Sequence, residues 1–368
     1  MSVVAELTLS HFRSHRSTKL AVDARPVAIY GANGAGKTNI LEAVSLLSPG
    51  RGLRRAQAED LIRRPEALGW KIKSILTGSG APNEIETSAE PGTARTVRID
   101  SKAQPQIALS KIARVVWLVP SMDRLWIEGA EGRRRFLDRM TMSFEPGHAE
   151  AVLTYEKGMR ERNRLLKDMV RDAHWYIALE RQMADAGAKV TANRRAALKR
   201  LAEAAEGAQT AFPSATLSIT HAQGPLPDAA DALAEALAQN RGADLRAGRT
   251  LIGPHRIDMN ALYIAKGVAA AQCSTGEQKA LLISLVLTNA RALAEDTGAP
   301  PLILLDEVAA HLDAERRAAL YDEIAALGAQ AWMTGTGPEL FEAMGDRAQY
   351  IDVIEENGES RAVQKATP

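Results

Sequence analysis

One segment of the chain, Gly31–Thr38, matches the phosphate-loop pattern G-x-x-x-x-G-K-[ST] at every fixed position. Its flanks supply the context that such a loop needs. Pro26–Tyr30 predicts a short buried strand before the loop, and Asn39–Leu47 has apolar residues at helical spacing after it. Glycines allow backbone N–H groups to surround phosphate oxygens, and the N-terminus of a helix adds partial positive charge. The segment therefore predicts a strand, a loop and a helix that bind a nucleoside triphosphate.

The residues of this loop are expected to share the work of holding the nucleotide. Lys37 reaches the β- and γ-phosphates of ATP, and Thr38 holds Mg²⁺. The residues predicted to contact the nucleotide here are Gly31, Ala32, Asn33, Gly34, Ala35, Gly36, Lys37, Thr38 and Asn39. The loop alone does not distinguish kinases, GTPases, transporters and DNA motors.

A second motif lies far down the chain. Pro301–Glu307 is an apolar strand that ends in two carboxylates. In such an arrangement Asp306 holds Mg²⁺, and Glu307 polarises the attacking water. Lys37 and Glu307 are therefore the predicted catalytic residues. Thr38 and Asp306 are the predicted metal ligands.

A third motif, Cys273–Lys279, has Ser-x-Gly-x-Gln at the start of a predicted helix. With the acidic pair and a Leu-Asp step at Leu312–Asp313, it resembles the signature of ABC-type ATPases. The resemblance implies that Ser274 and Gly276 of one chain contact the γ-phosphate held by a second chain. It thus implies an ATP-dependent homodimer.

Length and composition narrow the class. The 368 residues suggest two structural units at about 150 residues per domain. Hydrophobic residues make up 46% of the sequence, which is enough for a buried core. No apolar run approaches the roughly 20 residues that cross a bilayer, and Met1–Glu6 lacks the pattern of a signal peptide. We expect a cytoplasmic protein without a membrane partner. The single Cys273 excludes an internal disulfide.

The net charge of +1 is too small to indicate, by itself, that the protein binds nucleic acid. Positive charge is nevertheless clustered. Each cluster is either a helix face paired with acids or a contact for phosphate, and the sequence leaves both interpretations open. The clusters are Arg51, Arg54 and Arg55; Arg63 and Arg64; Arg133, Arg134, Arg135 and Arg139; Arg160, Arg162, Arg164 and Lys167; and Arg194, Arg195, Lys199 and Arg200.

A helical segment separates the two halves of the predicted nucleotide site. Residues 1 to about 130 alternate short apolar strands with turns. From His148 to Phe212 there is no proline, which predicts two long antiparallel helices with a break near Asp172–His174. The predicted fold class is α/β, a split ABC-type P-loop ATPase head with an inserted helical hairpin. The predicted domains are 1–147, the first half of the head; 148–212, the hairpin; and 213–368, the second half with the signature and the acidic pair.

Together these features resemble the RecF family, the recombination-mediator ATPases of bacterial gap repair and relatives of the SMC proteins. The matching segments are Leu7–His15, Gly31–Glu42, Gly50–Arg54, Pro120–Asp123, Arg133–Arg139, Thr250–Arg256, the signature and Asp306–Glu307. The combination of Arg133–Arg139 with Gly-Pro-His-Arg distinguishes RecF-like chains from their relatives. The resemblance also implies that Arg13 and Ser14 contact the nucleotide.

The same resemblance implies a function. The expected protein is a slow, DNA-stimulated ATPase that uses hydrolysis of Mg-ATP as a switch. ATP would join two heads into a dimer that binds duplex DNA and junctions of single- and double-stranded DNA, independently of sequence. The resemblance further implies work with RecR and RecO and help in loading RecA.

The sequence departs from related heads at three places. Thr334 and Thr336 stand where transporter heads place a histidine, Pro120–Met122 where relatives place a glutamine, and Gly50–Arg55 differs from the usual Gly-Arg-Ser-Phe-Arg. Two alternatives share the head: an SMC-like chromosome-organising ATPase, which would have a far longer coiled coil, and the nucleotide-binding subunit of an ABC transporter. A small-molecule kinase would need neither Glu307 nor the signature.

Overall fold

The computed structural model describes residues 2–64, 66–78 and 80–367. Contacts within the chain divide it into two compact units. Unit 1 contains residues 1–123, 208–212 and 282–368, and unit 2 contains residues 124–207 and 213–281. Helix α7 (Thr275–Thr297) begins in unit 2 and continues into unit 1.

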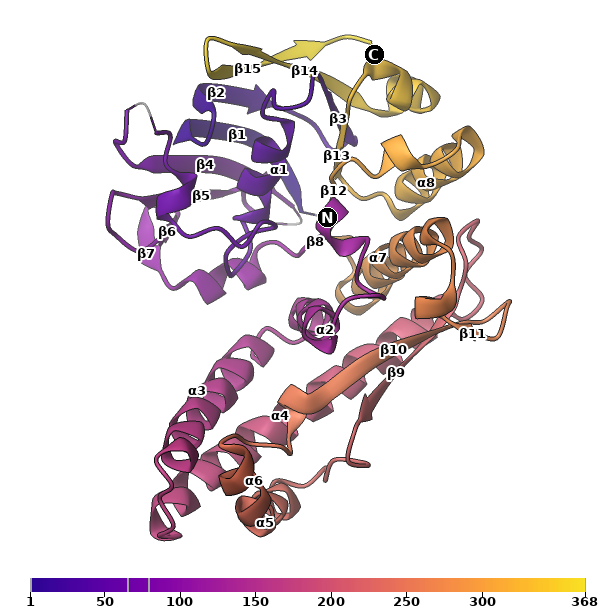
Figure 1. Ribbon diagram of the computed structural model, residues 1–368. Coiled ribbons are helices and arrows are strands. Elements are labelled where there is room, and N and C mark those ends of the chain that lie inside the picture. Colours follow the sequence, from indigo (N-terminus) through magenta and orange to yellow (C-terminus); the bar gives the residue numbers. More distant parts are fainter. Residues whose placement is uncertain (1, 65, 79, 368) are drawn as a thin grey trace. The chain divides into compact units, whose positions relative to one another are not determined.

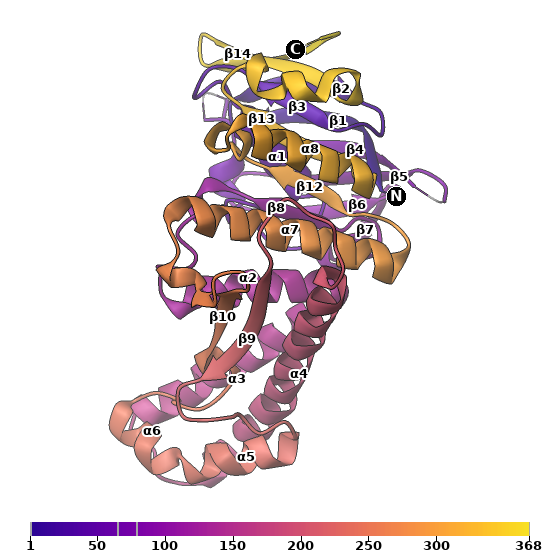
Figure 2. The same ribbon diagram turned by 90° about the vertical axis from the view of Figure 1, so that its right-hand side faces the viewer.

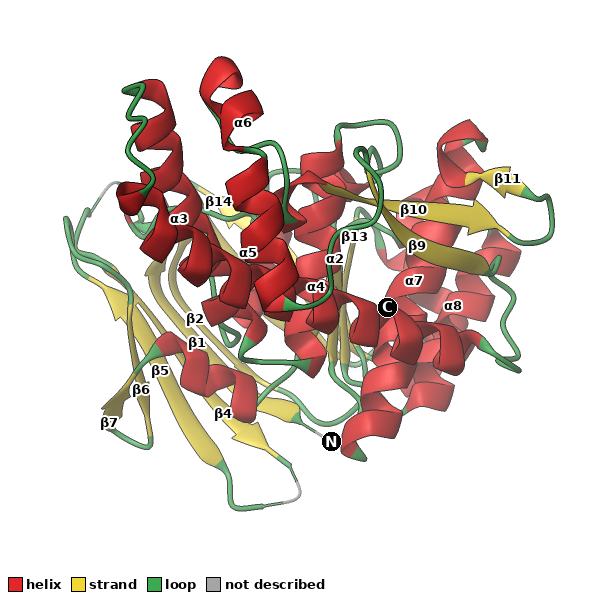
Figure 3. Ribbon diagram, turned by 90° about the horizontal axis from the view of Figure 1, so that it is seen from below, coloured by secondary structure: helices red, strands yellow, loops and turns green. Residues whose placement is uncertain are grey.

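The first sheet of unit 1 is antiparallel, with the strand order β2-β1-β4-β5-β6-β7 (Figure 3). Its strands are β1 (Val3–Phe12), β2 (His15–Ala21), β4 (Trp70–Thr77), β5 (Asn83–Ala89), β6 (Thr96–Ile99) and β7 (Lys102–Gln104). Buried residues alternate with more exposed ones along β4, the period of two expected when one face of a sheet covers the core.

The second sheet of unit 1 is mostly parallel, in the order β15-β14-β3-β13-β12-β8. Its strands are β3 (Val27–Tyr30), β8 (Val115–Leu118), β12 (Leu302–Leu305), β13 (Ala331–Gly335), β14 (Gln349–Glu356) and β15 (Glu359–Lys365). Only β15 pairs antiparallel, at one edge. β3, β8, β12 and β13 are buried along their whole lengths, as expected for parallel strands covered on both faces.

Helix α1 (Lys37–Ser45) joins the two sheets of unit 1, since it contacts both β1 and β13 (Figure 1). Its buried residues Ile40, Leu41 and Val44 belong to a core cluster that takes residues from both sheets. Helix α8 (Ala314–Leu327) begins after Asp313, whose side chain accepts a hydrogen bond from the backbone N–H of Arg316.

Unit 2 contains a helical arm, defined as α3 (His148–Lys167), α4 (His174–Ala205) and the turn between them. These are the two long helices predicted from the sequence, and the predicted break is the turn. The other elements are α2 (Ala130–Phe144), α5 (Ala230–Gln239), α6 (Arg241–Ala247), β9 (Ala215–His221), β10 (Ile257–Tyr263) and β11 (Val268–Ala269). The domain bounds 1–147, 148–212 and 213–368 remain a prediction.

The helices α5 and α6 pack against the arm, α5 on α4 and α6 on α3 (Figure 2). The strands β9, β10 and β11 form an antiparallel sheet, and β10 contacts α2. Within the described part of the chain, no helix combines the length and the apolar character that a membrane span requires.

A fully buried arginine ties the arm to α6. Arg162 of α3 donates to Glu180 of α4 at 3.1 Å, to Asp244 of α6 at 2.7 Å and to the hydroxyl of Thr250 at 2.9 Å. Arg241 also pairs with Glu180, at 2.6 Å. Since buried charges are stable only when they are paired and hydrogen-bonded, this network fixes the packing of three helices.

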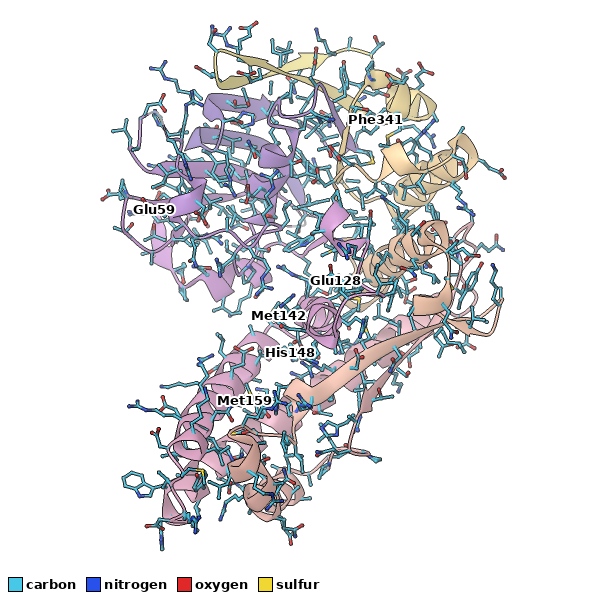
Figure 4. The ribbon with its side chains drawn as sticks, viewed as in Figure 1. Glu59, Glu128, Met142, His148, Met159 and Phe341 are labelled. Atoms are coloured by element: carbon cyan, nitrogen blue, oxygen red, sulfur yellow. The ribbon has the colours of Figure 1, made fainter. Side chains whose placement is uncertain are left out.

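A second set of ion pairs ties α2 to its neighbours. Asp138 of α2 accepts hydrogen bonds from Arg194 of α4 at 2.7 and 2.9 Å, and it lies 2.8 Å from His148 Nε2. Figure 4 shows His148 at the end of α3 that lies near α2, with Met159 further along the same helix. The start of the arm is therefore held by charge as well as by apolar packing.

We expect Arg162→Met to lower the free energy of unfolding by about 3–5 kcal/mol, because the buried carboxylates of Glu180 and Asp244 lose their shared guanidinium. Urea unfolding followed by circular dichroism measures the change. Arg164→Met, at an exposed position of the same helix, is the matched control and should change the free energy of unfolding by at most about 0.5 kcal/mol. Equal midpoints for the two variants would contradict the structural role of Arg162.

Candidate nucleotide-binding site

The predicted nucleotide residues of unit 1 meet at one edge of its parallel sheet. β3 ends at Tyr30 and leads into the phosphate loop, Gly31–Thr38. β12 ends directly before Asp306, and β13 carries Thr334 near its end. Since β13 lies between β3 and β12, the loop, the acid and the threonine are neighbours. In open α/β sheets, ligands bind at this carboxyl end of the strands.

Two glycines of the loop are required by the backbone. Gly31 and Gly36 have φ angles of +141° and +106°, which residues with a Cβ rarely adopt. A Cβ on Gly31 would lie 2.1 Å from the carbonyl oxygen of Val353, and a Cβ on Gly36 would lie 2.3 Å from Ser360 Oγ. Helix α1 begins directly after Gly36, so the loop carries the N-terminus of a helix, where an anion is stabilised.

Lys37 lies within the loop. Its Nζ donates to the carbonyl oxygens of Gly31 and Ala32, both at 2.9 Å. Burial lowers the pKa of Lys37, and the negative charges of Glu307 and Asp306 oppose this effect. Among the described residues, the close partners of the ammonium are these two backbone carbonyls, which can be exchanged for phosphate oxygens.

The hydroxyls of two threonines converge on Asp306. Thr38 Oγ1 and Thr334 Oγ1 each donate to Asp306 Oδ1 at 2.8 Å. The backbone N–H of Glu307 donates to Thr334 Oγ1 at 2.9 Å. Thr334 is fully buried, so its hydroxyl fixes both acids at once. A hydroxyl and a carboxylate in contact are the oxygen donors that Mg²⁺ prefers, so the residues present fit this metal.

Glu307 has a backbone conformation that is uncommon outside glycine. Its φ is +54°, in the left-handed region. A residue held in such a region costs about 1–3 kcal/mol, and such residues cluster at functional sites. The hydrogen bond to Thr334 is one contact that holds this backbone in place.

Arg13, predicted to contact the nucleotide, is held by a residue that the sequence patterns did not mark. Its Nε and Nη2 donate to the carboxylate of Glu42 at 2.9 and 2.8 Å, and its Nη1 donates to the carbonyl oxygen of Asp60 at 2.7 Å. Glu42 lies on α1, one turn after Thr38, and its side chain is fully buried. These three bonds use one N–H of each nitrogen, so two of the five guanidinium N–H groups remain for a contact with a nucleotide. A carboxylate inside an otherwise apolar helix is the signal that could have revealed Glu42.

Ser14, the other residue predicted from resemblance, lies beside the loop. Its Oγ accepts hydrogen bonds from Asn39 Nδ2 at 2.7 Å and from Ser360 Oγ at 2.6 Å. Arg63 Nη1 donates to the carbonyl oxygens of both Ser14 and Gly358, at 2.8 Å each. The hairpin of β14 and β15 is thus fastened to the turn of Ser14. Nothing local in the sequence marks Ser360, which lies 346 residues away.

The signature residues Ser274 and Gly276 lie in unit 2, at the start of α7. The backbone N–H and the hydroxyl of Ser274 both donate to Glu277 Oε2 at 2.9 Å, a capping box at the helix N-terminus. The ion pair with Lys266, followed by the hydrogen bonds from Ser274, lowers the pKa of Glu277 to about 2. A Cβ on Gly276 would meet no described atom within 4 Å, so packing within the chain does not require this glycine.

Several arginines of the basic clusters make internal contacts, including Arg63, described above, and four in unit 2. Arg133 donates to both carboxylate oxygens of Asp258, at 2.7 and 2.9 Å. Arg134 donates to the carbonyl oxygen of Ile257 at 3.0 Å, and burial lowers its pKa. Arg162 and Arg194 form the buried ion pairs described above. For these four the interpretation as structural residues holds.

Comparisons with known proteins agree with this geometry. The chain matches the family described as RecF/RecN/SMC N terminal domain over residues 3–361. A protein named DNA replication and repair protein RecF from Rhizobium etli is 44% identical over 363 residues, covering 96% of this chain and 97% of that protein. A protein of the same name from Agrobacterium fabrum is 44% identical over 362 residues, covering 95% and 96%.

Two solved structures show the fold. One, described as the recombination mediator protein RecF-ATPrS in the RecFOR pathway, has a TM-score of 0.85 and 23% identity and covers 98% of each chain. An Smc head domain from Pyrococcus furiosus has a TM-score of 0.57 and 16% identity and covers 99% of this chain and 96% of that one. The predicted class, an α/β ATPase head with a helical insertion, is confirmed. Because the family match spans residues 3–361 and relatives share 44% of their residues with it over nearly their full lengths, the chain belongs to the RecF family, as its sequence predicted.

Proposed function

We propose that this chain binds and hydrolyses ATP and uses the nucleotide to form a dimer that binds DNA in recombinational gap repair. The observation that carries the proposal is the convergence of Lys37, Thr38 and Asp306 at the carboxyl end of a parallel sheet, beside a glycine loop and a helix N-terminus. Membership of the RecF family supports the biological setting, since relatives are named for DNA replication and repair.

In this proposal the loop holds the phosphates of ATP. Backbone N–H groups of Gly31–Lys37 surround the phosphate oxygens, and Lys37 exchanges its carbonyl partners for the β- and γ-phosphates. Arg13 and Ser14 also contact the nucleotide, Arg13 through the N–H groups that Glu42 and Asp60 do not use. Thr38 and Asp306 would hold Mg²⁺, which when bound neutralises charge on the phosphates.

Glu307 acts as the general base for the attacking water. Its position is supported by Thr334, which accepts the Glu307 N–H and donates to Asp306. Thr334 thereby fixes Glu307 relative to Asp306, the proposed metal ligand. A general base that is already positioned lowers the entropy cost of reaching the reactive geometry. We propose a slow turnover that DNA stimulates, with hydrolysis as a switch.

The dimer would be joined by ATP. Ser274 and the N-terminus of α7 of one chain cap the γ-phosphate held by a second chain. Gly276 supports this role, because nothing described near it requires a glycine and a missing side chain allows close approach. Ser274 now donates to Glu277, so contact with a phosphate would replace that hydrogen bond. Hydrolysis removes the phosphate that bridges the two chains. The contacts that stabilised the closed dimer over the open state are then lost, and the dimer opens.

The closed dimer would bind duplex DNA and junctions of single- and double-stranded DNA through phosphate contacts, independently of sequence. The solved RecF of similar fold is described as part of the RecFOR pathway. We propose RecR and RecO as partners and RecA loading as the outcome.

Sizing the protein by light scattering with ATP, with ADP and without nucleotide, each with and without gapped DNA, tests the proposal as a whole. A dimer only with ATP, strengthened by DNA, supports it. A monomer in all six conditions overturns it.

We expect Glu307→Gln to retain ATP binding and to lower turnover at least about 100-fold, because the amide fills the same space but accepts no proton. Lys37→Met should instead weaken ATP binding by about 10- to 150-fold, since it removes a charged hydrogen bond to phosphate. Fluorescent-nucleotide binding and phosphate release measure the two effects. An equal loss of ATP affinity in both variants would show that the roles are wrongly assigned.

We expect Ser274→Arg to leave ATP binding by the monomer intact and to abolish the ATP-dependent dimer, because a bulky side chain would fill the position that faces the partner's γ-phosphate. Light scattering with ATP measures the dimer. Ser17→Arg, at an exposed position of β2, is the control and should still dimerise. An ATP-dependent dimer of Ser274→Arg would exclude the signature from the interface.

We expect ATP to steepen the salt dependence of duplex binding. Closing a dimer roughly doubles the phosphates neutralised, and log K falls by about 0.9 per phosphate against log salt. Fluorescence anisotropy over a salt series measures the slope. The same slope with ADP and ATP, or a preference above about tenfold for one sequence over a scrambled one, is inconsistent with a backbone-binding dimer.

A further inference from the structure

The outer face of α3 carries a regular series of cations. They follow one another at intervals of three and four residues, which places side chains on one face of a helix. All are exposed, whereas Arg162, which falls outside this spacing, is the buried arginine of the arm. We call the series the cationic stripe. Its members are Lys157, Arg160, Arg164, Lys167 and, in the turn after α3, Arg171.

Most of the stripe has no ionic partner. Among the residues that the structure describes, Arg160 pairs with Glu156 at 3.6 Å, and the other four cations form no ion pair. Glu161 and Asp168 lie on the same face by this spacing, four residues after Lys157 and Arg164, but no ion pair joins either acid to the stripe among the described residues. From Lys157 to Lys167 the stripe runs about 15 Å at 1.5 Å per residue.

The stripe leads to an exposed tryptophan. Trp175, in the first turn of α4, is 65% exposed. The other four tryptophans of the chain are at most 5% exposed; they are Trp70, Trp117, Trp126 and Trp332. An indole offers a large flat surface that is normally buried, so its exposure four residues after the last cation of the stripe points to a ligand that has both negative charge and flat rings.

The turn that carries Trp175 is firmly supported. The neighbouring Tyr176 is buried, and its ring lies 5.8 Å from the guanidinium of Arg162 and 5.6 Å from that of Arg241. The hydroxyl of Tyr176 donates to the carbonyl oxygen of Val170, in the turn itself, at 2.8 Å. The indole is therefore presented from an ordered base, which reduces the entropy cost of binding.

We propose that the cationic stripe and Trp175 form a contact surface for single-stranded DNA. The cations contact phosphates, and the indole stacks on an unpaired base. In a duplex each base is already stacked between its neighbours, whereas an unpaired base exposes a flat face to an aromatic side chain. The inference rests on the proposed function and assigns the single-stranded side of a junction to the arm.

Trp175 supplies the probe for the test. The full-length chain is titrated with a 15-nucleotide oligo-dT and with a duplex of the same length, and tryptophan emission is recorded. Oligo-dT should quench the emission of the exposed indole, and Trp175→Phe should remove most of this signal. The duplex should leave the emission unchanged. Quenching by the duplex to the same extent would overturn the assignment to single strands.

Affinity for labelled oligo-dT, measured by anisotropy, separates stacking from charge. Trp175→Ala should weaken binding by about 5- to 150-fold, and Trp175→Phe should restore most of it, since phenylalanine also stacks. Replacing Lys157, Arg164 and Lys167 by glutamine should reduce the salt slope by about 2, at about 0.7 per phosphate on single strands. Lys199→Gln, exposed on α4 outside the stripe, is the matched control and should keep the slope.

Unchanged emission with oligo-dT, or equal oligo-dT affinity of Trp175→Ala and the unaltered chain, overturns the proposal. So does a result in which Trp175→Ala loses only a protein partner such as RecR, because the exposed indole would then belong to a protein interface. Failure of the proposed function is distinguishable, since it appears in the unaltered chain as a missing ATP-dependent dimer and missing duplex binding.

Discussion

Parallel pairing of β3 with β13, and of β13 with β12, brings residues from opposite ends of the chain to one sheet edge. Thr38 and Asp306 are 268 residues apart in sequence, yet a hydrogen bond of 2.8 Å joins them. The strands themselves are buried and apolar, so polar groups are confined to the points where strands end. Thr334 stands at such a point and satisfies the carboxylate of Asp306 and the backbone of Glu307 with one hydroxyl. The chemistry of the site thus follows from strand order.

Much of this site could be predicted because its pieces are local. The loop Gly31–Thr38 needs glycines for its backbone, and the apolar run before Asp306 forms a buried strand. Each pattern can be recognised within a few consecutive residues. Contacts between distant segments could not be predicted. Ser360 reaches Ser14 from a hairpin without a recognisable motif, and Glu42, although unusual in an apolar helix, gives no local sign that its partner is Arg13. The helical arm could be predicted from the absence of proline, but its buried ion pairs depend on packing.

The arginines of this chain have two different roles, as buried partners of carboxylates and as exposed positive charges. Arg162 and Arg194 are buried against carboxylates and determine how helices pack, although neighbouring arginines in the same clusters face solvent. Spacing along the helix separates the two kinds, since a residue two positions from an exposed one points to the opposite side of α3. A near-neutral chain can therefore have locally positive faces, because many of its acids are used internally.

The hairpin of β14 and β15 supports the phosphate loop through Ser360 and Gly358, and β3 pairs with β14 as well as with β13. This has a consequence for synthesis on the ribosome. The roughly 320 residues that separate Thr38 from Ser360 take about 16–64 s to be made at bacterial or eukaryotic rates. During that time the nascent chain carries β3 without its parallel neighbours and a glycine loop without its support. The nucleotide site is thus among the first segments to be translated and the last to be completed.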